Sequence, residues 1–218
     1  MVTGVLAGRA VGAAGPKGEA IAQAALRLFL RDGYERTSVD AIAAEAGVSK
    51  RTIYNRYGDK ENLFLSVLRD TYTSMMVTFR EIAEKHLGEV TYVQQDLTAF
   101  ALEVAGRMTT APERIALVRL ILTEAPFFPT LIRGERGEQG PSTMRGNVTA
   151  YLARLGEEGR LAITDPSEAA DHLVALTINQ INTRTMFGVV PISDAEVERI
   201  ITAGVAAFVR AYRPAGER

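Results

Sequence analysis

The stretch Thr37–Lys60, TSVDAIAAEAGVSKRTIYNRYGDK, predicts two short helices joined by a tight turn. In its first half, apolar residues recur at the spacing that places side chains on one face of a helix. These residues are Val39, Ile42, Ala43 and Ala46. Gly47 predicts the turn, because a residue without a Cβ easily adopts the left-handed conformation that ends a helix. Ser49 follows as the expected cap of the second helix.

Capping residues mark where the neighbouring helices begin. Thr37 stands three residues before Asp40, the spacing at which a hydroxyl and a carboxylate satisfy the free amides of a first turn. Asp59 is expected to cap a longer helix that starts at Lys60. The N-terminus of that helix and the Lys60 ammonium would then hold one phosphate together.

The second short helix has an apolar edge and a polar edge. On a wheel of about 100° per residue, Ile53 and Tyr57 lie on one side. Arg51 and Asn55 point almost directly opposite. A helix of this diameter fits the major groove of B-DNA, where arginine pairs with guanine and asparagine with adenine. Arg51 and Asn55 are therefore candidate base-reading residues, with an ordinary solvated face as the alternative.

The polar edge is basic and carries hydroxyl groups. Between Ser49 and Lys60 there are four basic residues and one acid, which gives a local charge of +3 that favours phosphates. The hydroxyls of Thr37, Ser49 and Tyr54 are available for neighbouring phosphates. Such contacts fix the register of a protein on DNA without reading its sequence.

The segment from Ala20 to Leu68 resembles the N-terminal domain of the tetracycline-repressor (TetR/AcrR) family of bacterial regulators. The likeness rests on ALRLFLRDGYERTSV, which ends the first helix, and on the run IAAEAGVSKRTIYNRYGDKENLF. In that family the helix after the turn enters the major groove. The resemblance implies DNA contacts at Thr37, Ser49, Lys50, Arg51, Thr52, Tyr54, Tyr57 and Lys60, to which the helix wheel adds Asn55.

Composition indicates a soluble, cytoplasmic protein that is not an enzyme. The chain has 218 residues, 47% of them hydrophobic, and a net charge of −1. Residues 1–70 carry +2 and the remainder −3, so a positive surface for DNA must be local. No apolar stretch reaches the roughly 18 residues of a membrane span. Cysteine is absent and the only histidines, His86 and His172, lack metal-ligand spacing, so we expect no metal and no cofactor.

Catalytic motifs are missing as well. The sequence contains no G-x-S-x-G nucleophile elbow, no phosphate-binding glycine loop and no nucleotide fingerprint. Beyond Lys60, helical patterns follow one another without strand alternation. The sequence therefore predicts an all-α fold. The expected helices are 18–32, 38–45, 49–56, 59–86, 91–109, 113–124, 127–136, 141–158, 166–187 and 193–212.

Three parts are expected along the chain. Residues 1–16 form a flexible tail, 17–62 a three-helix DNA-binding domain, and 63–213 a larger helical domain for ligand binding and dimerisation. The tail holds few basic residues, so contact of an N-terminal arm with the minor groove is not expected. The fourth helix, about 42 Å long if unbroken, would connect the two domains.

The last two helices carry more apolar residues than one buried face needs. In the final helix these are Val197, Ile200, Ile201, Gly204, Val205, Phe208 and Val209. The resemblance implies that the last two helices of each protomer form the four-helix bundle of a homodimer, the alternative being a thick monomer core. A two-fold dimer requires a palindromic operator in double-stranded DNA, with half-sites about one helical turn or somewhat more apart.

The resemblance also implies a cavity for a small-molecule effector that is largely apolar. Its candidate lining residues are Tyr72, Met75, Met76, Phe79, Phe100, Met108, Phe127 and Phe128, although each also suits an ordinary core. In the ninth helix, Asn179 and Thr183 lie one turn apart and Met186 follows. They line either a pocket with hydrogen-bonding capacity, or a dimer contact or solvent-exposed face.

A second resemblance indicates a particular branch of the family for the C-terminal domain. The run Glu124-Ala125-Pro126-Phe127-Phe128-Pro129 is similar to one in the AefR-like branch of the family. The expected protein is thus a homodimeric repressor that a small molecule releases from its operator. The alternative is a DNA-binding regulator without such an inducer, acting as an activator or under control of a protein partner. An enzyme has the least support, because catalytic motifs are missing.

Overall fold

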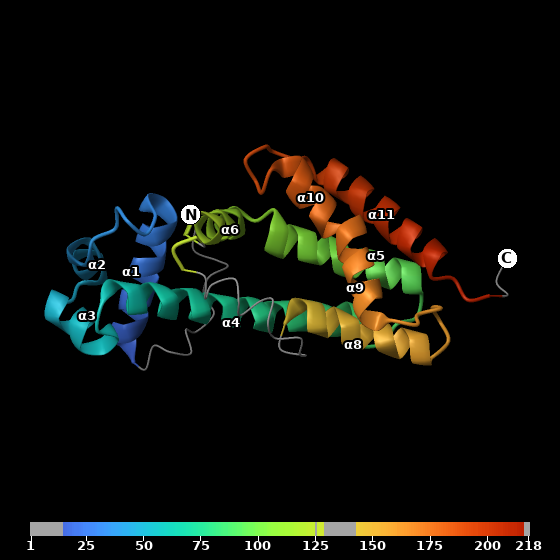
Figure 1. The fold of residues 1–218 in the computed structure, drawn as a ribbon, viewed down its shortest axis with the longest axis horizontal. Coiled ribbons are helices and arrows are strands. Elements are labelled where there is room, and N and C mark those ends of the chain that lie inside the picture. The colour runs from blue at the N-terminus through green and yellow to red at the C-terminus, as the bar shows by residue number, and fades with distance from the viewer. Residues whose placement is uncertain (1–14, 125, 129–142, 216–218) are drawn as a thin grey trace. The chain divides into compact units, whose positions relative to one another are not determined.

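The computed structural model describes residues 15–124, 126–128 and 143–215, and their regular elements are all helical (Figure 1). The predicted all-α fold is confirmed. The elements are α1 (Pro16–Asp32), α2 (Val39–Ala46), α3 (Lys50–Tyr57), α4 (Lys60–Leu87), α5 (Val93–Val104), the π-helix η1 (Ala105–Thr109), α6 (Pro112–Glu124), α8 (Met144–Glu157), α9 (Pro166–Leu176), α10 (Ile178–Thr185) and α11 (Asp194–Ala211).

These residues form two compact units. The first comprises residues 15–77 with 119–124 and 126–128, and the second comprises residues 78–118 and 143–215. Two helices, α4 and α6, therefore begin in one unit and end in the other.

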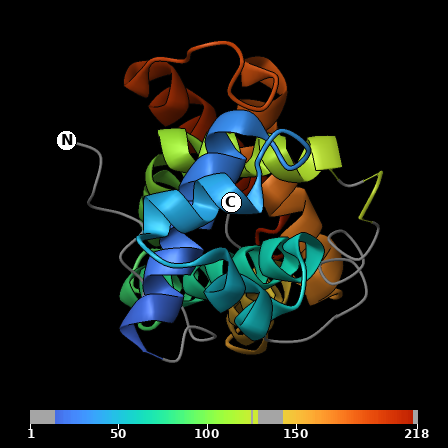
Figure 2. The ribbon, with the colours of Figure 1, turned by 90° about the vertical axis from the view of Figure 1, so that its left-hand side faces the viewer.

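The first unit packs α1, α2 and α3 around a small apolar core, and Figure 2 turns these helices toward the viewer. Each short helix contributes the apolar face that its sequence spacing predicts. The side chains buried there include Ile21, Phe29, Ile42, Ile53, Leu63 and Phe64. Burying a large aliphatic or aromatic side chain contributes about 1.5–3 kcal/mol, which holds helices as short as α2 and α3 in place.

An aromatic cluster extends this core to the segment after α6. The rings of Phe29 and Phe64 meet edge to face, with centroids 5.0 Å apart. The ring centroid of Tyr34 lies 4.8 Å from that of Phe64 and 4.9 Å from that of Phe128. Phe128 is 8% exposed and belongs to the same compact unit. Phe128 is thus part of the core of the N-terminal unit.

The second unit is a bundle of the remaining helices. α11 packs against α5 and α9, and α9 also packs against α8 and α10. In Figure 1, α8 runs beside the second half of α4, where the Tyr151 hydroxyl donates to Glu84 Oε2 at 3.0 Å. The buried side chains include Ile82, Leu97, Leu152, Leu155 and Phe208.

The ninth helix differs from its prediction, because the single helix expected over 166–187 is interrupted at Thr177. This residue has φ −122° and ψ −90°, so α9 ends before it and α10 begins after it. A Cβ on Gly204 of α11 would lie 2.0 Å from the Leu176 carbonyl oxygen. We attribute the break to this close approach, because a regular helix through Thr177 would place its backbone in the space that the α11 backbone occupies.

Two other predicted helices differ in detail. The helix expected over 91–109 is α-helical only to Val104 and continues as η1, where the Thr110 amide donates to the Ala105 carbonyl at 2.9 Å. The helix expected over 127–136 falls largely outside the described residues. Its first two residues follow a turn in which the amides of Phe127 and Phe128 both donate to the Glu124 carbonyl at 3.0 Å.

Candidate DNA-binding surface

The turn between α2 and α3 has the predicted geometry. Gly47 adopts the left-handed conformation, with φ 65° and ψ 34°, and ends α2. The Ser49 hydroxyl accepts a hydrogen bond from the Thr52 amide and caps α3, as predicted. Because both helix ends are fixed by local hydrogen bonds, the direction of α3 is set by a few residues of backbone.

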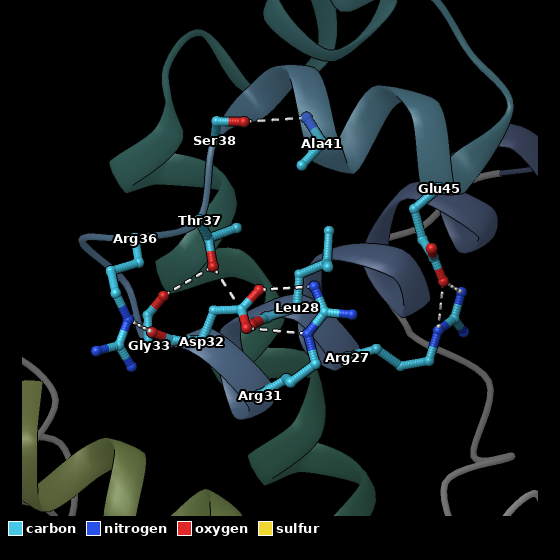
Figure 3. A network of polar contacts seen from close by, with 10 residues as sticks. All are labelled: Arg27, Leu28, Arg31, Asp32, Gly33, Arg36, Thr37, Ser38, Ala41 and Glu45. Carbon is cyan, nitrogen blue, oxygen red and sulfur yellow. Dashed lines mark hydrogen bonds and ion pairs between the residues drawn. The ribbon is translucent and has the colours of Figure 1, made fainter.

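The cap of α2 corrects the sequence prediction. Ser38, not Thr37, caps this helix, with its hydroxyl accepting from the Ala41 amide at 3.1 Å. Thr37 is 2% exposed, and its hydroxyl donates to the carbonyl oxygens of Gly33 at 2.7 Å and Leu28 at 3.3 Å (Figure 3). It joins the end of α1 to the start of α2 and leaves no hydroxyl for a phosphate, so we omit Thr37 from the surface proposed below.

Ion pairs and hydrogen bonds on the surface of the first unit also connect α1 to the segments that follow it. Arg27 donates to Glu45 Oε1 through Nε at 3.2 Å and Nη2 at 3.1 Å, and so joins α1 to α2 (Figure 3). Arg31 donates to both carboxylate oxygens of Asp32, which lowers the pKa of Asp32. Arg36 donates to the Asp32 carbonyl at 2.8 Å. These arginines are engaged within the unit and were not among the predicted DNA contacts.

Helix α3 presents the two predicted edges. Ile53 is 1% exposed and anchors the helix in the core, whereas Arg51, Tyr54 and Asn55 are exposed. Thr52 and Tyr57 are half-buried at the flanks, with the Thr52 and Ser49 hydroxyls 2.8 Å apart. The structure therefore brings the candidate base-reading residues together on one outward face, held by a buried isoleucine.

The charge of this face is modulated from α2. Lys50 Nζ donates to Asp40 Oδ2 at 3.0 Å, and this hydrogen bond raises the pKa of Lys50. Both side chains are open to solvent, at 47% and 70% exposure. The Lys50 ammonium also lies 6.0 Å from the centre of the Tyr54 ring. Sequence reasoning placed Lys50 on the DNA-facing side but missed Asp40 as its partner, ten residues away.

Lys60 stands at the N-terminus of α4, as predicted, and has two contacts of its own. Its ammonium lies 4.2 Å from the centre of the Tyr34 ring and donates to the Glu35 carbonyl at 3.3 Å. Asp59 caps the helix by accepting from the Asn62 amide at 2.7 Å. Lys60 is half-buried, so it joins α4 to the chain between α1 and α2 and keeps part of its surface for a phosphate.

The predicted effector-binding residues occupy several environments. Phe79 and Phe100 are buried in the second unit, with ring centroids 5.7 Å apart. Met76 is buried, and Tyr72 and Met75 are half-buried on α4. The side chain of Met108 lies outside the description.

Two adjacent phenylalanines of that set are placed elsewhere. Phe127 is 76% exposed, and Phe128 packs in the aromatic cluster of the first unit. Neither lines an interior wall of the second unit, because the turn after Glu124 directs one side chain to solvent and the other into the first core. Neither is therefore proposed as an effector contact.

Two of the polar residues predicted to lie on the ninth helix face outward on α10. Asn179 and Thr183 are exposed and line a shallow groove of about 220 Å³ with Ala175, Gln180 and Arg184. Met186 is exposed at the end of α10, in the left-handed conformation. This placement leaves both predictions standing, a pocket wall and a dimer contact or solvent-exposed face.

The described segments show no group of metal-ligating side chains able to hold an ion. Within the same segments, no helix is both long and apolar enough to cross a membrane. A short capped helix with an exposed, basic, arginine- and asparagine-bearing edge, fixed to a three-helix core by a glycine turn, defines a helix-turn-helix DNA-binding protein.

Comparison with known proteins gives the family. The N-terminal profile of the bacterial regulatory proteins of the TetR family matches residues 21–67, and the profile of the AefR-like transcriptional repressor C-terminal domain matches residues 95–214. The chain belongs to the TetR family of transcriptional regulators. Its matches are regulators, not enzymes.

Individual relatives agree. The chain is 31% identical over 161 residues to the HTH-type transcriptional repressor AcnR of Corynebacterium efficiens, covering 72% of this chain and 75% of the relative. A TetR-family regulator from Mesorhizobium loti has a similar structure, with a TM-score of 0.81 and 30% identity, covering 90% of this chain and 96% of that one. The flavonoid-responsive regulator FrrA gives a TM-score of 0.67 at 29% identity, covering 92% and 98%.

Proposed function

We propose that this DNA-binding regulator is a homodimeric repressor, acting in the cytoplasm, that leaves a palindromic operator when a small molecule binds its C-terminal domain. The observation that carries the DNA-binding half is the outward edge of α3. Arg51 and Asn55 are exposed there, while Ile53 fixes the helix from behind. Arginine and asparagine are the side chains that pair bidentately with guanine and adenine in the major groove.

The groups around that edge set the register on DNA. Ser49, Lys50, Thr52, Tyr54, Tyr57 and Lys60 are the proposed contacts to the sugar-phosphate backbone. Lys60 lies on the first turn of α4, where the free amides of a helix N-terminus also attract a phosphate. Neutralising phosphates releases counterions, so binding should weaken steeply as salt rises.

The dimer is proposed to form through α9, α10 and α11. The strongly apolar side chains of α11, such as Ile201 and Phe208, are buried within the protomer. Small residues remain accessible on these helices, Ala175 and Ala203 among them. Small side chains permit close helix packing, and the polar groups Asn179 and Thr183 can form hydrogen bonds across a two-fold axis.

The response to an effector is proposed to pass through α4 and α6, since each belongs to both compact units. At the end of α6, Glu124 is buried and its Oε1 accepts from the Tyr34 amide at 3.3 Å. Phe128 follows in the same aromatic cluster as Tyr34. A shift of α6 therefore acts directly on the core that supports α3. FrrA, described as flavonoid-responsive, supports control by a small molecule.

The energetic demand on such a switch is modest. An effector that prefers the conformation unable to fit DNA shifts the equilibrium by its difference in affinity for the two conformations. Each tenfold difference corresponds to about 1.4 kcal/mol, and allosteric coupling of about 1–3 kcal/mol is common.

The test is binding of the purified protein to the intergenic DNA beside its own gene, by fluorescence anisotropy at several salt concentrations with scrambled DNA as competitor. We expect saturable binding with two protomers per site that survives the competitor. Arg51→Ala should relax base preference at one position per half-site by about 1–3 kcal/mol. Arg145→Ala is the matched control, because Arg145 pairs with Asp171 in the second unit.

Two results would contradict the proposal. Equal affinity for intergenic and scrambled DNA, followed by no preferred site in a selection from random DNA, would remove the sequence-specific regulator. Specific binding that no compound in a broad library of small apolar and amphipathic molecules releases would leave the regulator and remove the inducer.

A further inference from the structure

A buried arginine in the second unit lacks the partner that such a group normally has. Arg114 lies in the first turn of α6 and is 2% exposed. Its Nε and Nη1 atoms have no hydrogen-bond partner among the described residues. Native structures pair most buried polar groups, and buried charges most consistently of all. A guanidinium with two unpaired nitrogens at this depth therefore indicates a binding site for an anion.

The neighbouring charges do not supply that partner. Burial lowers the pKa of Arg114, the nearby Glu113 raises it, and the like charge of Arg107 lowers it. Glu103 on α5 is already engaged, because Lys85, His86 and Arg107 all bond to its carboxylate. No ion pair joins Arg114 to an acid in the part of the chain that the structure describes.

Arg114 remains charged although burial lowers its pKa, because a guanidinium holds its proton more strongly than any other side chain. An uncompensated buried charge costs several kcal/mol, whereas an apolar residue of similar volume at the same position avoids this cost. A charged group of this kind becomes favourable when an anion arrives. The planar guanidinium matches the two oxygens of a carboxylate or the oxygens of a sulfonate or phosphate.

We propose that the effector of this regulator is an amphipathic anion, whose negative group is bound by Arg114 and whose remaining body is apolar. That this ligand is an effector rests on the proposed function. That it is an anion rests on the buried guanidinium of Arg114. Arg114 is 2% exposed, so an anion that pairs with it has to leave water, and an apolar body favours that transfer.

The position of Arg114 gives the anion a route to the DNA-binding domain. Arg114 lies in the second unit, and Glu124, at the other end of the same helix, lies in the first. An anion that binds the guanidinium acts on α6 at one end, and Glu124 transmits to Tyr34 at the other. The negative group would thus both fix the ligand and displace the helix that carries the response.

The test uses two fluorescent probes that differ in charge. Anilinonaphthalene sulfonate is an apolar anion, and N-phenylnaphthylamine is a neutral compound of similar shape. Each is titrated into the full-length wild type, Arg114→Met, Arg114→Lys and the control Arg119→Met. Arg119 lies on the same helix but is exposed. Thermal unfolding shows that each variant is folded.

We expect one sulfonate site per protomer in the wild type. Loss of a charge-assisted hydrogen bond of about 1.5–3 kcal/mol predicts sulfonate binding about 10- to 100-fold weaker in Arg114→Met. Arg114→Lys should be intermediate, because it keeps the charge but not the fork. The neutral probe should bind all four proteins alike, and Arg119→Met should match the wild type with both probes.

Three outcomes would overturn the proposal. The first is the absence of saturable sulfonate binding to the wild type, and the second is an unchanged sulfonate affinity in Arg114→Met. The third is an equal loss of affinity for both probes in Arg114→Met, which would mean that Arg114 shapes the site without binding the negative group. If Arg114→Met fails to fold, Arg114→Lys decides by the same comparison. Release of operator DNA is measured separately. Arg114-dependent sulfonate binding without DNA release would leave the anion site standing and remove the inducer mechanism.

Discussion

The ion pair between Asp40 and Lys50 places a negative charge beside the proposed base-reading edge. Asp40→Asn keeps the size of the side chain and leaves Lys50 free to meet a phosphate. We expect tighter binding to any DNA, and a plot of log affinity against log salt steeper by up to about 0.9, because the proposed contact of Lys50 with a phosphate then forms without competition from Asp40. Anisotropy titrations at several salt concentrations measure both quantities. An unchanged slope would mean that Lys50 already releases Asp40 when DNA binds.

At this scale, sequence reasoning succeeded where the determinants are local. The outward direction of Arg51 and Asn55 follows from four residues of helix geometry, and the structure places both on the exposed edge. The choice of Ser38 over Thr37 as the cap of α2 was not predictable in this way. Thr37 is withdrawn from capping because the carbonyls of Leu28 and Gly33 accept its hydroxyl, and that contact depends on how α1 meets α2.

Glu103 is the residue whose titration should be visible in the stability of the protein. Hydrogen bonds from Lys85, then His86 and Arg107, outweigh the effect of burial and lower its pKa from the ordinary 4.5 to about 2. Its stabilising contribution is therefore fully present above about pH 4.5 and is lost as the pH falls toward 2. Urea unfolding of the wild type and Glu103→Gln across this range measures it.

The comparison with Glu103→Gln isolates this carboxylate from the other acids of the chain. The stability difference between the two proteins should be largest at neutral pH and should shrink as the pH approaches 2. Since the Glu103 side chain is 22% exposed, solvent screens part of the effect. A difference that stays constant with pH would show that the pKa of Glu103 is the same in the folded and the unfolded chain.

At the scale of elements, the contact between α9 and α11 depends on a glycine. A Cβ at Gly204 would lie 2.0 Å from the Leu176 carbonyl oxygen, which is backbone and cannot turn aside. Gly204→Ala should therefore force the helices apart and lower the free energy of unfolding by roughly 1–3 kcal/mol. Chemical denaturation measures the change.

The control for this substitution is Gly106→Ala in η1, where an added Cβ meets nothing within 4 Å. Replacing a glycine in open space reduces the entropy of the unfolded chain and should raise stability by about 0.4–1 kcal/mol. If Gly204→Ala changed the free energy of unfolding no more unfavourably than Gly106→Ala, the α9–α11 approach would tolerate a methyl group.

The contact between α9 and α11 also shows why some helix ends could be predicted from the sequence and one could not. The start of α3 and the end of α2 carry their own signals, Ser49 and Gly47. The break at Thr177 carries none, because no glycine or proline interrupts 167–187. It is set by Gly204, 27 residues later along the chain, and only the packed structure relates the two.

At the scale of the whole molecule, the proposed response requires that an effector bound to the C-terminal unit act on α3. The candidate route runs along α6 to Glu124 and Phe128, a connection that the sequence did not reveal. Phe128 was predicted to line the effector cavity, because the family resemblance implies such a cavity and phenylalanine suits its apolar walls. Its ring instead contacts Tyr34 and Phe64. Both residues are far from Phe128 in the sequence, so these contacts could not be predicted from it.

Phe128→Leu tests this route, with its neighbour Phe127→Leu as the matched control. Leucine keeps most of the buried apolar volume but removes the ring contacts to Tyr34 and Phe64, worth about 0.5–1.5 kcal/mol each. The coupling free energy is the change in operator affinity on saturation with an effector that releases the wild type. In Phe128→Leu it should fall by about 0.5–2 kcal/mol, with operator affinity in the absence of effector changed less.

Phe127→Leu should retain the full coupling, because that ring is 76% exposed and contributes little to the cluster. Linkage supplies a second measurement, since DNA must weaken effector binding by the same factor by which effector weakens DNA binding. Both determinations should therefore fall together in Phe128→Leu. If they stay at the wild-type value, the aromatic cluster supports the DNA-binding unit without transmitting to it, and α4 alone carries the response.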